Sequence, residues 1–164
     1  LNAGINVLYS GTVAAAIEGA FFGITSIAVS LEYSEQANFQ KSAIWARQII
    51  RQIMEQKERA SLLYNLNMPT SALEKEELPE VHITPMSTAR YGEDFIRRKD
   101  PKGRTYYWAT CDPPIQAEPV ESDVAALSKG HLSLTPLQFD MTKHYEISTI
   151  QNWGLHLAAD ESVG

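Results

Sequence analysis

The order of elements in the first half of the chain predicts an α/β fold, in which helices cover a parallel sheet. Residues 12–23 and 38–56 are predicted helices, and residues 26–31 and 63–68 are predicted strands. The β-rich run SIAVSL is typical of a buried strand, and LYNLNM is stopped by Pro69. Helices and strands that alternate with short links favour parallel strands joined by helical crossovers.

The first helix, Thr12–Gly23, has recognisable signals at both ends. Ser10 or Gly11 lies near its N-cap, and Gly23 is a plausible left-handed terminator. Most of its side chains are small, so its surface is smooth. We therefore expect this helix to pack closely on a sheet.

The second helix, over residues 38–56, is amphipathic. Its apolar residues recur at spacings of three and four, while basic and acidic residues occupy the other faces. The expected apolar face consists of Phe39, Ala43, Ala46, Ile50 and Ile53.

The second half of the chain has a different sequence pattern. The polar, acidic stretch Ser71–Glu80 is a predicted loop, and 113–120 is a predicted irregular connection with three prolines. Strand-like runs at Val81–Pro85 and Thr105–Thr110 flank a charged stretch with a turn at Asp100–Gly103, which predicts a projecting hairpin or arm. The remaining predicted elements are a short helix at Asp123–Ser128, a strand at His131–Leu137 and a helix at Tyr145–Ala159.

Composition limits the classes of function. With 164 residues and 44% hydrophobic content, the chain is large enough to bury a core. A net charge of −6 argues against broad nucleic-acid binding, including a duplex partner, but leaves a local nucleotide site open. The apolar run near residues 13–24 is too short to span a bilayer and contains Glu18. The single cysteine, Cys111, suits a reducing compartment, so the cytoplasm is the expected location.

The opening segment carries the main candidate site. Free backbone N–H groups at a helix start, the hydroxyls of Ser10 and Thr12, and Gly11 for close approach together suit an anion such as phosphate. The simpler interpretation is that Ser-Gly-Thr is only an N-cap. Asn2 and Asn6, in the preceding loop, are by residue type ordinary turn residues.

Other chemistry-bearing residues give weaker signals. The four histidines have no metal-ligand spacing, so no histidine metal site is expected; they are His82, His131, His144 and His156. Cys111 has no evident basic partner and is expected to be an inert thiol. The simplest interpretation of the basic cluster at residues 97–104 is a solvated hairpin tip. The functional alternative is that its positive charge steers an anionic substrate toward a neighbouring subunit's site.

Four segments together resemble the SurE family of survival-protein-E nucleotidases and phosphatases. They are NAG…YSGTVAAAIEGAFFGITSIAVSL at residues 2–31, LNMP at 66–69, DPKGRTYYW at 100–108 and SDVAALSKGHLSLTPLQFDMT at 122–142. The resemblance implies a Rossmann-like three-layer α/β sandwich. It further implies a core part at residues 1–80, a hairpin oligomerisation arm at 81–112, and a return strand with a C-terminal helix at 113–164. The arm and the terminal helix imply a homodimer or homotetramer.

The resemblance also implies an activity: hydrolysis of nucleoside 5′- and 3′-monophosphates that depends on a divalent metal, Mg²⁺ or Mn²⁺. The family's metal site uses two adjacent aspartates, a serine and an asparagine, of which only the asparagine has a counterpart here, Asn2. The aspartates are expected upstream of Leu1, so this segment alone is expected to be inactive. Asn6, Ser10, Gly11 and Thr12 are the implied phosphate- and substrate-binding residues. The loop between Asn6 and Tyr9 is shorter than the family's usual loop.

Two alternatives belong to other classes. One is a catalytically silent SurE-like module that binds nucleotide or mediates oligomerisation. The other, a dinucleotide-binding oxidoreductase, is disfavoured because no GxGxxG follows a strand. If the first strands of the parallel sheet are absent, its edge and the apolar faces of residues 12–31 are expected to be exposed.

Overall fold

A computed structural model describes residues 1–35, 37–56, 63–89, 94–110 and 121–157. The helices are η1 (Gly4–Tyr9, a 3₁₀ helix), α1 (Gly11–Phe21), α2 (Phe39–Glu55), α3 (Thr70–Glu74), α4 (Asp123–Ser128) and α5 (His144–Gln151). The strands are β1 (Ser26–Leu31), β2 (Leu63–Met68), β3 (Val81–Ile83), β4 (Asp94–Lys99), β5 (Thr105–Thr110) and β6 (Leu132–Pro136). The irregular connection predicted at 113–120 and Cys111 lie outside the described residues.

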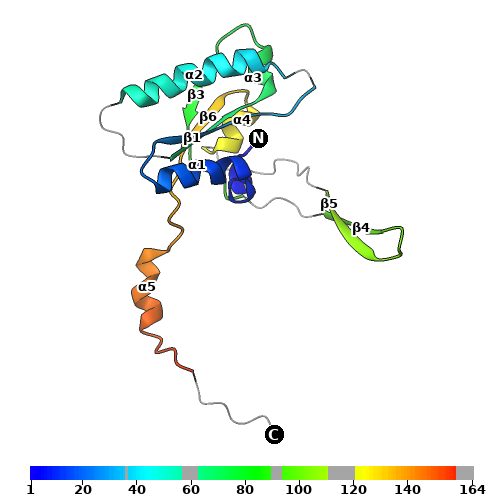
Figure 1. Cartoon of the computed structure of the whole chain (residues 1–164), viewed down its shortest axis with the longest axis vertical. Coiled ribbons are helices and arrows are strands. Elements are labelled where there is room, and N and C mark those ends of the chain that lie inside the picture. The colour runs from blue at the N-terminus through cyan, green and yellow to red at the C-terminus, as the bar shows by residue number, and fades with distance from the viewer. Residues whose placement is uncertain (36, 57–62, 90–93, 111–120, 158–164) are drawn as a thin grey trace.

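The central sheet has four strands in the order β1-β2-β6-β3 (Figure 1). β1 and β2 are parallel, as their connection through α2 predicts. β6 runs antiparallel to β2 and parallel to β3, so the sheet is mixed. As a result, the carboxyl ends of β1 and β2 share one edge of the sheet with the amino ends of β3 and β6.

Helices cover both faces of this sheet, which gives the predicted three-layer α/β sandwich (Figure 1). On one face, α2 buries Trp45, Ala46 and Ile53 against Leu66 and Met68 of β2. On the other face, the main contacts of α1 are Val13, Ala16 and Ala20 against Ala28 and Leu63. The two apolar clusters therefore use alternate residues of the same strands.

The prediction for α1 is confirmed at both of its ends. The Ser10 hydroxyl accepts a hydrogen bond from the Val13 amide at 3.1 Å, and Gly23 follows the C-cap with a φ of +75°. Gly19 shows why small residues are needed, because a Cβ there would clash with the hydroxyl of Ser26 on β1. The helix thus packs closely on the sheet, as its small side chains predict.

For α2 the predicted helical spacing of apolar residues is right, but the predicted set of buried residues is partly wrong. Ala46 and Ile53 are buried and Ile50 is half-buried, whereas Phe39 and Ala43 are exposed. The core face instead includes Ser42 and Trp45. Phe39 is the first residue of the helix, after the N-cap Asn38, and its side chain is exposed.

Three predicted boundaries need correction. The expected loop at 71–80 begins within α3, where Ala72 and Leu73 bury their side chains in the α2-side core. Residues 81–83 form β3 in the central sheet, so the hairpin contains only β4 and β5. The terminal helix ends at Gln151, shortly before Gly154 takes a φ of +62°, rather than continuing to Ala159.

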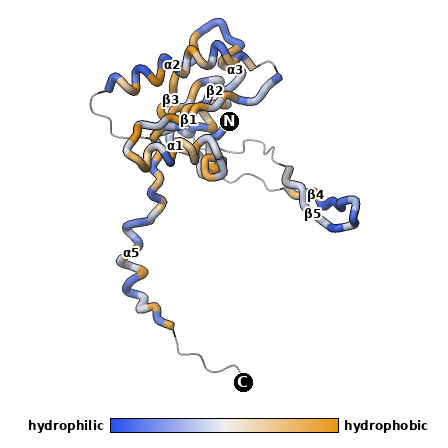
Figure 2. Tube along the Cα trace, viewed as in Figure 1, coloured by the Kyte–Doolittle hydropathy of each residue, from blue (hydrophilic) through white to orange (hydrophobic). Residues whose placement is uncertain are grey.

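The β4–β5 hairpin and α5 extend away from the layered body (Figure 1). The predicted turn is confirmed: the backbone of Asp100 pairs with Arg104, and Gly103 has a φ of +81°. The basic residues make the hairpin tip strongly hydrophilic (Figure 2). Nothing in α5 is buried. None of the described helices has the length and apolar character needed to cross a bilayer.

Candidate functional site

Asn2 is fixed at the carboxyl edge of β1 and β2. Its backbone amide donates to the side-chain oxygen of Asn67 at 2.8 Å, and its backbone carbonyl accepts from the side-chain amides of Asn65 and Asn67. Its own side-chain nitrogen donates to the hydroxyl of Ser30 on β1 at 2.7 Å. This set of bonds orients the Asn2 amide, and its oxygen has no hydrogen-bond partner in the part of the chain that the structure describes.

Asp123 holds the next part of the same segment. Its side chain is fully buried, and its two carboxylate oxygens accept from the backbone amides of Gly4 and Ser87, each at 2.8 Å. One of these oxygens also accepts from the amide of Val124 at the start of α4. A buried carboxylate with three N–H donors is a strong anchor, because hydrogen bonds to a charged acceptor are stronger than neutral ones.

The strand face beneath Asn2 is polar, although it is buried. Asn65, Asn67, Ser133 and Thr135 point to the same side of β2 and β6, and each is at most 2% exposed. Among the described residues, Asn65 Oδ1 and the hydroxyls of Ser133 and Thr135 have no hydrogen-bond partner. Buried polar atoms in folded proteins are normally paired, so this row needs a partner such as ordered water.

Asn6 lies in a different environment from the loop that the sequence suggests. It belongs to η1, and it lines a small pocket of about 220 Å³ together with Leu1, Glu32 and Pro69. The Glu32 carboxylate accepts hydrogen bonds from the backbone amide and the hydroxyl of Thr70, at 2.9 and 2.8 Å. The short Asn6–Tyr9 segment thus forms a helical turn that leads directly to the Ser10 cap.

At the start of α1, the three predicted phosphate-binding residues have different roles. Ser10 is buried and its hydroxyl caps the helix. Gly11 and Thr12 are exposed, and a Cβ built on Gly11 would meet no atom within 4 Å. The open space at Gly11 leaves the first N–H groups of α1 accessible to an anion.

The predicted site residues therefore form two groups, one before and within η1 and the other directly after it. Asn2 is bonded to the sheet edge and Asn6 lines the small pocket, while Ser10 borders a larger groove of about 720 Å³. That groove is mostly apolar, with Val7, Leu8, Ile17 and Met86 among its lining residues. No hydrogen bond between described residues joins Asn2 or Asn6 to Ser10, Gly11 or Thr12.

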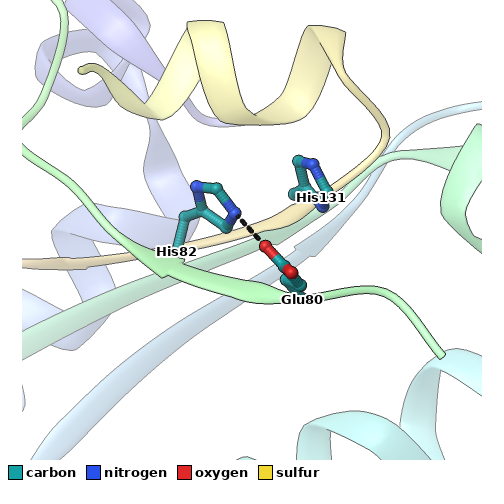
Figure 3. A group of neighbouring side chains, drawn as sticks. All are labelled: Glu80, His82 and His131. Carbon is teal, nitrogen blue, oxygen red and sulfur yellow. Dashed lines mark hydrogen bonds and ion pairs between the residues drawn. The ribbon is translucent and has the colours of Figure 1, made fainter.

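Two of the histidines that have no metal-ligand spacing in the sequence lie together in the structure. Glu80, His82 and His131 each offer a ligand atom, and these atoms lie within 4.8 Å of one another (Figure 3). They meet because β3 pairs with β6, although His82 and His131 are far apart in sequence. The ring of His144 pairs with Asp140, and the ring of His156 pairs with the backbone carbonyl of Gly154.

Sequence reasoning also missed the residues that hold Asn2 and Gly4. Asn65 and Asn67 alternate within an otherwise apolar strand, which is a readable signal of a polar function on one strand face. Asp123 looks like an ordinary acidic residue in the first turn of a helix. Its contact with Gly4 depends on tertiary structure alone.

The fold and the anchored loop define a mixed three-layer α/β protein with a candidate anion site at a helix start. A sequence model of the family described as "Survival protein SurE" matches residues 1–93. The chain belongs to the SurE family.

Individual relatives agree with this assignment. The chain is 49% identical to a protein named 5′-nucleotidase SurE from Rhodopirellula baltica, over 94% of this chain and 60% of that one. It is 40% identical to the 5′-nucleotidase SurE of Picosynechococcus, over 93% of this chain and 61% of the relative. The crystal structure of the SurE protein from Aquifex aeolicus superposes with a TM-score of 0.80 at 28% identity, covering 94% of this chain and 61% of the other. The chain thus spans about 60% of the length of these relatives.

Proposed function

We propose that the full-length protein hydrolyses the phosphate monoester of nucleoside 5′- and 3′-monophosphates with the help of a divalent metal. Two relatives of high identity carry the name 5′-nucleotidase. The single observation that supports the proposal most directly is the oriented amide of Asn2 at the sheet edge, fixed by Asn67 and Ser30.

Asn2 fits the role of a neutral metal ligand. Its side-chain nitrogen is occupied by Ser30, so its oxygen is the atom left for a hard cation such as Mg²⁺ or Mn²⁺. Asp123, the nearest carboxylate in the hydrogen-bond network of this segment, is fully occupied by backbone amides. We therefore propose that the charged metal ligands lie outside these 164 residues. When bound, the metal polarises the phosphoryl oxygen and lowers the pKa of a bound water.

The start of α1 is the proposed phosphate-binding part. The N–H groups beside Gly11 and the exposed hydroxyl of Thr12 would donate to non-bridging phosphate oxygens, and the positive end of the helix favours the negative charge. Ser10 supports this arrangement indirectly, because its hydroxyl is used to cap the helix. Asn6, beside the small pocket, is the proposed substrate-side amide.

Assembly and location complete the proposal. We propose that the β4–β5 hairpin and α5 mediate a homodimer or homotetramer, since α5 exposes Tyr145, Ile147 and Ile150 and the described part of the chain buries none of its residues. A reducing compartment such as the cytoplasm suits a chain with one cysteine.

The decisive experiment measures phosphate release from a panel of nucleoside monophosphates by the full-length protein with Mn²⁺ or Mg²⁺, and with EDTA as the control. We expect release that requires the metal. Thr12→Val keeps the branched shape but removes the hydroxyl, and it should lower turnover by about 10²–10³. Thr12→Ser should retain most of the activity.

The outcomes separate the alternatives. No release from the full-length protein with any metal or nucleotide would favour a silent nucleotide-binding or oligomerisation module. Wild-type turnover in Thr12→Val would remove Thr12 from the site but leave the nucleotidase itself intact.

A further inference from the structure

The second cluster of interest lies at the amino ends of β3 and β6. Glu80 and His82 are two residues apart, so they point to the same face of their strand. β3 pairs with β6 in the register Val81↔Leu132 and His82↔Ser133, which places His131 beside Glu80. The three side chains converge next to α4 (Figure 3).

These side chains are already in contact. His82 Nε2 lies 2.9 Å from a carboxylate oxygen of Glu80, and the rings of His82 and His131 stack with their centroids 4.4 Å apart and an interplanar angle of 15°. The Nδ1 atom of His131 is buried and has no hydrogen-bond partner among the described residues. One ring nitrogen of each histidine and a carboxylate oxygen of Glu80 thus lie within 4.8 Å of one another.

The charge state of Glu80 suits a cation. The hydrogen bond from His82, followed by the nearby positive charge of protonated His131, lowers the pKa of the Glu80 carboxyl. Glu80 is therefore ionised at neutral pH. Both histidines place a ring nitrogen within 4.8 Å of this carboxylate, so the cluster offers imidazole ligands as well.

We propose that Glu80, His82 and His131 form a metal site for a divalent transition cation such as Zn²⁺, separate from the site at Asn2. Two imidazole nitrogens and one carboxylate favour Zn²⁺ or a similar ion over Mg²⁺, which prefers oxygen ligands. Three protein ligands leave a fourth position open for water or a substrate group.

The geometry needs little adjustment. Ligand atoms on a tetrahedral Zn²⁺ with bonds of about 2.0–2.2 Å are roughly 3.4 Å apart. The three candidate atoms lie within 4.8 Å of one another, so small rotations of exposed or half-buried side chains bring them to an ion. Glu121 lines the adjoining pocket, and its negative charge favours a bound cation. Lys129 lines the same pocket, and its positive charge disfavours a bound cation.

The site is a neighbour of the Asn2 anchor but does not share its ligands. Asn67, which holds Asn2, pairs with Ser133, and Ser133 pairs with His82. Two inter-strand spacings, roughly 10 Å, therefore separate the backbones of Asn67 and His82. None of the residues that hold Asn2 belongs to the group of Glu80, His82 and His131.

The test measures Zn²⁺ binding by equilibrium dialysis to the full-length protein after removal of any histidine tag, in excess Mg²⁺ to occupy sites that prefer oxygen ligands. We expect His82→Gln and His131→Gln each to bind one Zn²⁺ fewer per chain than the wild type, or to bind it more than about 100-fold more weakly. His144→Gln is the matched control, because His144 also pairs with a carboxylate, at 2.6 Å, but has no second histidine beside it.

A second readout needs no variant. In wild-type protein with ¹⁵N-labelled histidine, Zn²⁺ should shift the ring nitrogens of both His82 and His131 and leave those of His144 unchanged. Equal Zn²⁺ binding by the wild type and both variants, or a shift of only one of the two rings, would overturn the site. Neither outcome depends on nucleotidase activity, so the proposed function is tested separately.

Discussion

The carboxylate of Asp123 accepts a hydrogen bond from the backbone amide of Gly4 at 2.8 Å, across 119 positions of sequence. The same carboxylate accepts from the amide of Ser87. One buried side chain of α4 thus fixes both the segment that follows Asn2 and the segment that follows β3.

The first prediction concerns this anchor. Asp123→Ala leaves the buried amides of Gly4, Ser87 and Val124 without their acceptor, and an unsatisfied buried group costs about 1–3 kcal/mol. We expect a loss of at least about 3 kcal/mol in the free energy of unfolding, measured by urea denaturation. Asp123→Asn keeps one oxygen acceptor and should lose less. The exposed Glu76→Gln is the control and should change stability by less than about 0.5 kcal/mol. An equally small change in Asp123→Ala would contradict the anchoring role.

The second prediction concerns Asn67. Asn67→Ala removes both the acceptor for the Asn2 amide and a donor to its carbonyl, so we expect a cost of about 1–3 kcal/mol. Because Asn2 would lose its orientation, Mn²⁺ affinity of the full-length protein should fall about 10–100-fold. Isothermal titration with Mn²⁺, together with denaturation, measures both effects. Unchanged Mn²⁺ affinity in a folded variant would show that Asn67 supports only the fold.

A third prediction compares two glycines of the same helix. Gly11→Ala meets open space, so stability should be equal to the wild type or up to about 1 kcal/mol higher, while the added methyl group narrows the proposed phosphate site and raises KM. Gly19→Ala would clash with Ser26 and should lower the melting temperature. Thermal melts and phosphate-release kinetics separate the two cases. If Gly11→Ala is less stable than the wild type and has an unchanged KM, the open space at Gly11 is not a phosphate-binding site.

The fourth prediction concerns pH and the hairpin turn. The backbone amide of Arg104, followed by its guanidinium, lowers the pKa of the Asp100 carboxyl below its usual range. A carboxyl with a lowered pKa stabilises the turn above its ordinary pKa of about 3.9, and this contribution is lost as the pH falls through the lowered value. In an NMR titration the Asp100 midpoint should therefore lie below the usual range. Arg104→Gln should raise it only part of the way, because the backbone amide remains. A full return to the usual value would assign the whole effect to the guanidinium.

Local signals in the sequence predicted most of the elements correctly. Ser10 and Gly23 delimit α1, Asn38 caps α2, and Ser122 caps α4 through a hydrogen bond to the Ala125 amide. These features depend on residues a few positions apart, and short-range chemistry determines them.

The parts that sequence could not predict depend on strand register. Residues 81–83 look like the start of a hairpin, and only their pairing with β6 places them in the central sheet. The same pairing brings His82 to His131, although their spacing in the chain resembles no ligand pattern. Residues that share a motif, such as Asn2 and Ser10, lie in different surroundings because η1 separates them.

The placement of β6 between β2 and β3 has a consequence for the order of folding. Both neighbours of β6 are synthesised before it, so β2 and β3 can pair with it only after residue 136 has left the ribosome. Contacts of such high sequence separation carry a large loop-closure cost and form slowly. The contact of Gly4 with Asp123 depends on α4, and the position of His82 beside His131 depends on β6. A nascent chain can therefore make these two contacts only late, once α4 and β6 have been synthesised.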